Sequence, residues 1–174
     1  METKPSSIAD ARLQGAYEYW RRIAAGRAMP SRRDLDPVDI PRLLPHVMLV
    51  EVHGPGRYRY RLIGTANSQE HGMNATGRFL DEVLKGPQYR AHVLGLYDEC
   101  VRERRPVYSE SLFLADTGGA IERHTKVLFM PLSEDGTAVN QVFVAQVFHY
   151  VEQKTRDQHF IVSRPHKEIA HAVL

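Results

Sequence analysis

Apolar residues near the start of the chain recur at three- and four-residue steps, which is the period of one face of an α-helix. These positions are Leu13, Ala16, Tyr17, Trp20, Ile23 and Ala24. We therefore predict an amphipathic helix over residues 7–25, with Ser7 as its N-cap and stop signals at Gly26 and Pro30. Its apolar face either docks on the sheet of the same chain or forms a dimer or partner surface made by Leu13, Tyr17, Trp20 and Arg21.

Further along the chain, alternation of apolar and polar residues predicts strands at 47–53, 57–64, 107–115, 120–132 and 139–151. Glycine-containing turns follow the first, third and fourth of them. Residues 66–84 are typical of short helical pieces, and residues 86–105 of one long helix. The last strand, QVFVAQVFHYV, is apolar on both faces, so we expect helices to cover both sides of the sheet.

Together these elements predict one α+β domain. It has a five-stranded antiparallel sheet with helices on one face, and the N-terminal amphipathic helix partly covers the other. We divide the chain into an N-terminal helix and docking segment (1–45), a core (46–152) and a C-terminal tail (153–174). The polar tail is expected to be loose or docked on a partner, with a short helix at 167–173 as the ordered alternative.

Charge and composition narrow the classes of function. The net charge of +2 is too small for a dedicated nucleic-acid binder, so no nucleic acid is expected as a partner. One cysteine, Cys100, excludes internal disulfides and cysteine-rich metal sites and favours a cytoplasmic location. No leader and no membrane span are visible, so we expect no membrane contact. Asp34, Asp36 and Asp39 lack the pattern of an EF-hand loop, and no metal is predicted.

Motifs of catalysis are missing as well. The sequence has no GxSxG elbow, no phosphate-binding loop and no HExxH, so we predict that the protein is not an enzyme. A local basic cluster is interpreted as solvated helix and loop faces, with a site for an acidic partner or a nucleotide phosphate as the alternative. It consists of Arg21, Arg22, Arg27, Arg32 and Arg33.

The order of elements resembles a PAS domain preceded by an N-terminal helix. Three continuous segments carry a closer resemblance: YWRRIAAGRAMPSRRDLDPVDIPRLLPHVMLVEV, RYRYRLIGT and TGRFLDEV. They are similar to a bacterial family of small PAS-like proteins first catalogued as a domain of unknown function, over residues 13–151. The resemblance implies a PAS-like five-stranded sheet around a small interior and a role in sensing or signalling. It implies no reaction.

PAS-like sheets hold haem, flavin, organic acids or nothing, so the cofactor stays unknown. His92 on the long helix is the candidate haem ligand, and His71 lies in the preceding cluster. A flavin photoadduct is disfavoured because residues 74–79 contain no cysteine, and Cys100 is predicted to be a core residue. The predicted ligand-binding residues between sheet and helices are Tyr60, Leu62, Phe79, His92, Tyr97, Phe113, Val127 and Phe143.

The sequence thus predicts a stand-alone PAS-like sensory module that acts through protein–protein interaction, with a small ligand in its cavity as the candidate switch. Because no output domain is visible in the chain, a signalling protein is expected as a partner, and a homodimer is expected through the N-terminal helix. The alternative is a cone-shaped α+β enzyme that binds a small molecule. A buried Asp–Tyr or His–Asp pair inside the cavity would favour that alternative.

Overall fold

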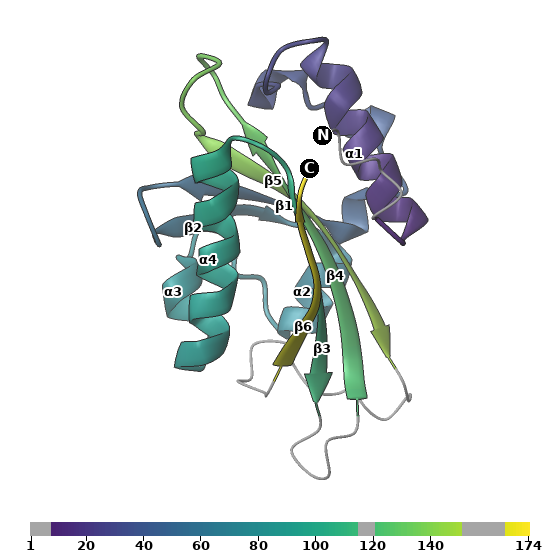
Figure 1. Ribbon diagram of the computed structural model, residues 1–174, viewed down its shortest axis with the longest axis vertical. Coiled ribbons are helices and arrows are strands. Elements are labelled where there is room, and N and C mark those ends of the chain that lie inside the picture. The colour runs from purple at the N-terminus through teal and green to yellow at the C-terminus, as the bar shows by residue number, and fades with distance from the viewer. Residues whose placement is uncertain (1–7, 115–120, 151–165) are drawn as a thin grey trace.

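The computed structural model describes residues 8–114, 121–150 and 166–174, which form one antiparallel sheet with helices on both faces (Figure 1). The sheet has six strands in the order β2-β1-β5-β4-β3-β6. They are β1 (Val47–Val52), β2 (Tyr58–Ile63), β3 (Val107–Leu114), β4 (Ile121–Leu132), β5 (Gln141–Tyr150) and β6 (His166–Val173). The predicted α+β architecture is confirmed, with one strand more than expected.

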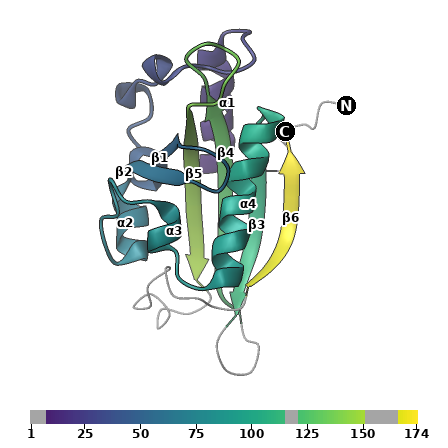
Figure 2. The same ribbon diagram turned by 90° about the vertical axis from the view of Figure 1, so that its left-hand side faces the viewer.

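The helices divide between the two faces of this sheet (Figures 1 and 2). Helix α4 (Pro87–Glu103) covers one face, and the short helices α2 (Thr65–His71) and α3 (Leu80–Val83) lie beside the end formed by β1 and β2. Helix α1 (Ala11–Ala24) covers the other face. Strand β5 is therefore covered on both sides, as its two apolar faces predict.

Helix α1 packs on its own sheet. Asp10 caps it by accepting a hydrogen bond from the amide of Arg12, and the predicted cap Ser7 lies outside the described residues. Leu13, Tyr17 and Trp20 are buried, and the indole Nε1 of Trp20 donates to the Pro131 carbonyl at 2.9 Å. The prediction that these three side chains form a partner surface is therefore wrong for the folded chain. Only Arg21 of that set is exposed, and dimerisation itself stays a prediction.

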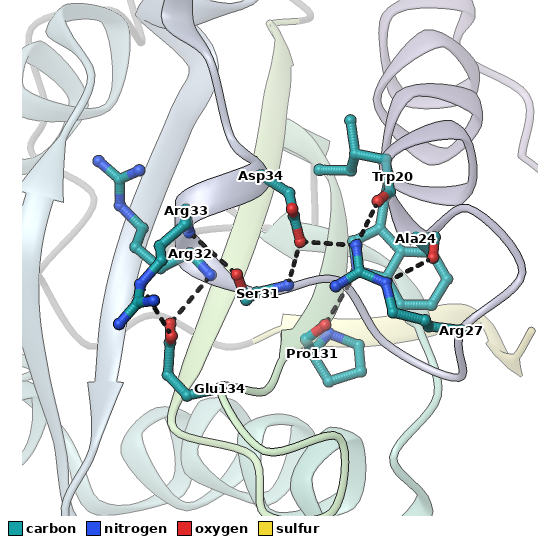
Figure 3. A network of polar contacts seen from close by, with 10 residues as sticks. Trp20, Ala24, Arg27, Ser31, Arg32, Arg33, Asp34, Pro131 and Glu134 are labelled. Carbon is teal, nitrogen blue, oxygen red and sulfur yellow. Dashed lines mark hydrogen bonds and ion pairs between the residues drawn. The ribbon is translucent and has the colours of Figure 1, made fainter.

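The loop after α1 is held by a polar network (Figure 3). The Arg27 side chain donates to the Ala24 carbonyl at 2.9 Å and to Asp34 at 2.8 Å, and the Ala24 carbonyl also accepts the Arg27 backbone amide. Arg33 lies 3.7 Å from Glu134 in the turn between β4 and β5. Arg27 thus connects the end of α1 to the following loop, and Arg33 connects that loop to the turn between β4 and β5.

The segment before β1 contacts the end of β2 through Gly64. The predicted helical turn at Asp36 is confirmed as Pro37–Asp39, and a second turn follows at Leu44–His46. A Cβ on Gly64 would lie 2.3 Å from the carbonyl oxygen of Leu44, and the Gly64 amide donates to Val47 at 2.7 Å. Only glycine allows this approach of two backbones. Two of the segments that carry the family resemblance therefore meet in space.

Strand β6 comes from the predicted C-terminal tail. It pairs with β3 along its length, and the Leu174 amide then donates to the Pro106 carbonyl at 2.8 Å. The predictions of a helix at 167–173 and of a loose tail are wrong for residues 166–174, because pairing with the open edge of β3 outweighs a weak local preference. Residues 153–165 and the predicted hairpin turn at 116–119 lie outside the described residues.

Candidate functional site

A cavity of about 40 Å³ lies between α4 and the sheet. Its floor consists of alternate residues of β3, β4 and β5, since side chains two apart on a strand share a face. Its walls come from α4, from the end of α2 and from single residues of β1 and β2. The lining residues are Met48, Tyr60, His71, Leu84, Tyr89, His92, Val93, Leu96, Tyr97, Ser109, Ser111, Phe113, Thr125, Val127, Phe129 and Gln146.

Five of the predicted ligand-binding residues meet in this cavity: Tyr60, His92, Tyr97, Phe113 and Val127. The rings of Tyr97 and Phe129 contact edge to face, with centroids 4.8 Å apart, so the apolar part of the wall is closely packed. Whether these residues bind a ligand stays a prediction.

Three predicted residues lie elsewhere. Leu62 is 46% exposed, because a bulge shifts the register of β2 against β1 after Tyr60. Phe143 faces α1, where its ring centroid lies 6.4 Å from that of Tyr19. Phe79 is covered by the Arg57 guanidinium, which lies 3.7 Å from the ring centroid. The prediction that these three side chains face the interior beneath α4 is therefore wrong.

The polar part of the cavity was missed at the sequence level. Ser111, Thr125 and Gln146 are 6%, 4% and 5% exposed, and they line the cavity from three adjacent strands. Ser111 of β3 pairs with Thr125 of β4, and Gln146 of β5 pairs with Val127 of β4. Their common signal is a polar residue at an inward position of each strand, a pattern that an apolar core does not require.

These three side chains make no hydrogen bond within the described part of the chain, and the Thr125 hydroxyl is fully enclosed. Buried polar groups in folded proteins nearly always have a partner, which can be an ordered water or a ligand. The floor of the cavity therefore carries hydrogen-bonding groups that the described residues do not use.

A buried arginine lies beside the cavity, outside its lining. Arg123 is 6% exposed, lies two residues before Thr125 on β4, and holds its guanidinium 4.4 Å from the ring centroid of Phe113. Its Nη1 lies 4.0 Å from the Glu70 carboxylate of α2. Burial, together with the charge of Arg123, lowers the pKa of His71 to about 4. At neutral pH the imidazole is thus uncharged, and Arg123 is the cation of this region.

The phenols in the wall are neutral for the same reason. Burial raises the pKa of Tyr60 and of Tyr97 above the ordinary value of 10.0. Neither hydroxyl makes a hydrogen bond within the described residues. Both can therefore donate a hydrogen bond to a guest at any pH at which the protein works.

A family model described as PAS domain matches residues 9–145, which is most of the chain. The chain belongs to the PAS domain family. The matched range contains α1, the strands β1–β4, the helices α2, α3 and α4, and the first part of β5. This membership identifies the protein as a sensory module at the level of its family.

No curated protein matches this PAS domain. Among solved structures, it is similar to the ligand-binding domain of the Pseudomonas aeruginosa PAO1 amino-acid chemoreceptor PctC in complex with GABA. That likeness has a TM-score of 0.41 and 14% sequence identity, and it covers 83% of this chain and 56% of the other. The chain therefore spans little more than half of that domain, and the likeness is too distant to indicate a ligand.

The first residue of β6 contacts side chains that line the PAS cavity. The rings of His92 and His166 have centroids 4.5 Å apart, and His166 also lies 5.9 Å from the rings of Tyr89 and Phe113. Burial lowers the pKa of both histidines, and in His92 the neighbouring His166 adds to the effect. The C-terminal strand therefore touches the candidate site directly.

A large cofactor does not fit the PAS cavity in this conformation. Ordinary ligand pockets measure about 300–1,000 Å³, whereas this one has about 40 Å³. Haem or flavin would thus require α4 to move outward, and His92 already contacts His166. Cys100 is fully buried, which confirms its prediction as a core residue, and burial raises the pKa of its thiol.

The described residues contain neither a metal-binding cluster nor a membrane-spanning helix. No group of three or more histidine, cysteine, aspartate or glutamate side chains is arranged to hold a metal ion. No helix in this part of the chain is long and apolar enough to cross a bilayer.

Proposed function

We propose that this PAS domain is a regulatory sensor whose cavity beneath α4 receives a small molecule, and that the occupied state is recognised by a signalling protein. One observation carries the proposal: the floor of the cavity carries the buried Thr125 hydroxyl, which has no hydrogen-bond partner within the described residues. A cavity that served only as core would be expected to be apolar, because each unpartnered buried hydroxyl costs about 1–3 kcal/mol.

The route from the cavity to the surface runs through β6 in this proposal. His166 at the start of β6 contacts three rings of the cavity wall, and β6 is the edge strand of the sheet. A guest that displaces these rings would alter how β6 pairs with β3. An edge strand with its free backbone groups is also a common surface for partner proteins. A cytoplasmic setting and a homodimer are parts of the proposal that this geometry leaves open.

An enzymatic role receives no support from a reactive pair in the cavity. The structure does contain a partly buried Tyr–Asp pair, in which the Tyr58 hydroxyl donates to Asp98 at 2.5 Å. Asp98 also accepts from the Gly56 amide at 2.8 Å, and neither Tyr58 nor Asp98 lines the cavity. This pair fastens the turn between β1 and β2 to α4, and we propose no reaction for it.

A thermal-shift screen with a metabolite library tests the proposed function. We expect at least one compound to raise the melting temperature by about 5 °C or more when it is present at a hundredfold excess over its dissociation constant. Val127→Leu, which fills part of the cavity, should reduce this shift. Val142→Leu adds the same methylene to a buried position away from the cavity and should keep it. A library without a stabilising compound, or equal shifts in both variants, would contradict the proposal.

A further inference from the structure

We infer that the exposed segment between α1 and β1 joins two copies of this chain, with Val38 of each copy inserted into a groove of the other. This interface names a surface that the proposed function leaves open, and it does not depend on a guest in the cavity beneath α4. Three observations lead to it: an exposed apolar side chain on a fixed turn, an open groove beside it, and two charges of opposite sign without ion-pair partners in the described part of the chain.

Val38 is the most exposed of the large apolar side chains in the described part of the chain, at 82%. It lies on the helical turn Pro37–Asp39, whose backbone is fixed from both sides. The Asp36 carboxylate accepts from the Val38 amide at 2.9 Å, and the Tyr19 hydroxyl of α1 accepts from the Asp36 amide at 2.8 Å. Because Val38 is also β-branched, it loses little freedom on binding and is suited to enter a groove of another molecule.

A groove of about 340 Å³ opens beside this turn. One side consists of Ala11, Arg12 and Gly15 of α1, and the other side of residues 39–43. A Cβ at Gly15 would meet nothing within 4 Å, although glycine in a helix interior is less stable than alanine. The described residues of this chain therefore leave room here for an apolar side chain from another molecule.

The groove carries one positive charge that the chain does not balance. Arg12 lies 3.0 Å from Asp10, and Asp39 lies 3.4 Å from Arg22, so the charges of these two lining residues are paired within the chain. Arg42 also lines the groove, is exposed, and has no ion-pair partner among the described residues. The groove is thus complementary to an apolar side chain that is accompanied by a carboxylate.

The same surface supplies that combination. Asp36 is exposed beside Val38 and has no ion-pair partner among the described residues. In a two-fold symmetric dimer, residue i contacts residue j and residue j contacts residue i. Val38 of each copy then enters the groove of the other, and Asp36 of each copy faces Arg42 of the other. Each copy uses both halves of its patch, so the assembly closes at two copies.

Sedimentation velocity of the full chain over a wide range of concentrations tests this interface. We expect a reversible monomer–dimer equilibrium in the wild type. Val38→Ser should raise the dissociation constant about tenfold or more, because it removes apolar surface that the dimer buries. Ile169→Ser is the matched control, since Ile169 is another exposed apolar residue, 44% exposed on β6 and outside the patch. It should dimerise as the wild type does.

Gly15→Leu separates a role in association from a role in folding. The leucine should occupy the groove and raise the dissociation constant about tenfold or more. It should not lower the melting temperature, because leucine favours a helix more than glycine does. Gly95→Leu on α4 is the control, since a Cβ at Gly95 also meets nothing within 4 Å and Gly95 lies outside the groove. This variant should keep both the dimer and the melting temperature.

Exchange of the two charges tests the reciprocal contact. Arg42→Glu alone and Asp36→Arg alone should each raise the dissociation constant about tenfold or more, because like charges then face each other twice. An equimolar mixture of the two variants should form a heterodimer, since both contacts again join opposite charges. Asp36→Arg also removes the cap of the Pro37–Asp39 turn. If that variant folds poorly, Arg42→Glu together with Val38→Ser decides the question.

Three results would overturn the interface. One is a wild-type chain that stays monomeric at every concentration, and another is a dimer that Ile169→Ser dissociates while Val38→Ser does not. The third is a mixture of folded charge variants that forms no heterodimer. No ligand is added in these measurements, so failure of this interface leaves the sensor function to the thermal-shift screen.

Discussion

Arg61 determines on which face of the sheet Leu62 lies. Val50 pairs with Tyr60 and Leu49 pairs with Leu62, so Arg61 is the additional residue of a bulge in β2. A bulge shifts the alternation by one position, and the side chain that follows moves to the opposite face. The sequence RYRYRLIGT alternates without interruption and gives no sign of the bulge. Tyr60, before the bulge, could therefore be placed from the sequence, whereas Leu62 could not.

Gly64 offers a test at the same scale. We expect Gly64→Ala to destabilise the fold by about 2 kcal/mol or more, because the new Cβ would lie 2.3 Å from a backbone carbonyl that cannot move independently. Gly95→Ala on the exposed side of α4, where a Cβ would meet nothing within 4 Å, should stabilise by about 0.5–1 kcal/mol. Urea unfolding of both variants measures the difference, and equal stabilities would contradict the close approach at Gly64.

His71 makes stability depend on pH. Burial, with a contribution from Arg123, lowers its pKa from 6.5 to about 4, so between these values the unfolded chain binds a proton that the folded chain does not. Stability is thus complete above about pH 6.5 and decreases as the pH falls toward 4. Between pH 7 and pH 5 the loss due to His71 is about 2 kcal/mol. Urea unfolding of the wild type and His71→Gln should show a smaller loss in the variant, and identical losses would refute this role.

At the scale of elements, local pattern identified the helices and strands better than their partners. The period of α1 and the proline at the start of α4 predict both helices close to their observed bounds. What α1 packs against, and that β6 would pair with β3, depends on residues far away in the chain. A polar, weakly patterned segment such as His166–Val173 becomes a strand only because β3 presents an open edge to it.

Trp20 distinguishes a helix that docks on its own sheet from one that docks on a partner. We expect Trp20→Ala to lower the free energy of unfolding by about 3–5 kcal/mol, because it removes a buried ring and the hydrogen bond to Pro131. Arg21→Ala, at the exposed neighbouring position, should change it by less than about 0.5 kcal/mol. If Trp20→Ala altered only the molecular mass in light scattering and left the stability unchanged, α1 would be a partner surface after all.

Strand β6 can be tested by removing it. Truncation after residue 165 should expose the edge of β3, so we expect hydrogen exchange of the β3 amides to accelerate by at least about tenfold. The amides of β1, on the other side of the sheet, serve as the internal control and should keep their protection. Unchanged exchange in β3 would mean that β6 contributes nothing to the order of this edge.

At the scale of the whole molecule, the sequence predicted the PAS architecture and the apolar half of the cavity. Aromatic and aliphatic residues such as Tyr97 and Val127 could be assigned to the interior because burial is what their chemistry favours. The polar half could not, since Ser111, Thr125 and Gln146 resemble ordinary strand residues until the topology brings their three strands together beneath α4. The arrangement that gives the cavity its polar floor thus arises from tertiary structure alone.

The most direct test of the sensor function is a crystal structure of the full chain soaked with the compound that stabilises it most. We expect difference density for that compound between α4 and the sheet, within hydrogen-bonding distance of the Thr125 hydroxyl and the Gln146 amide. Density for the compound only on the outer surface, with the cavity unchanged, would contradict the claim that this PAS domain senses a small molecule in its core.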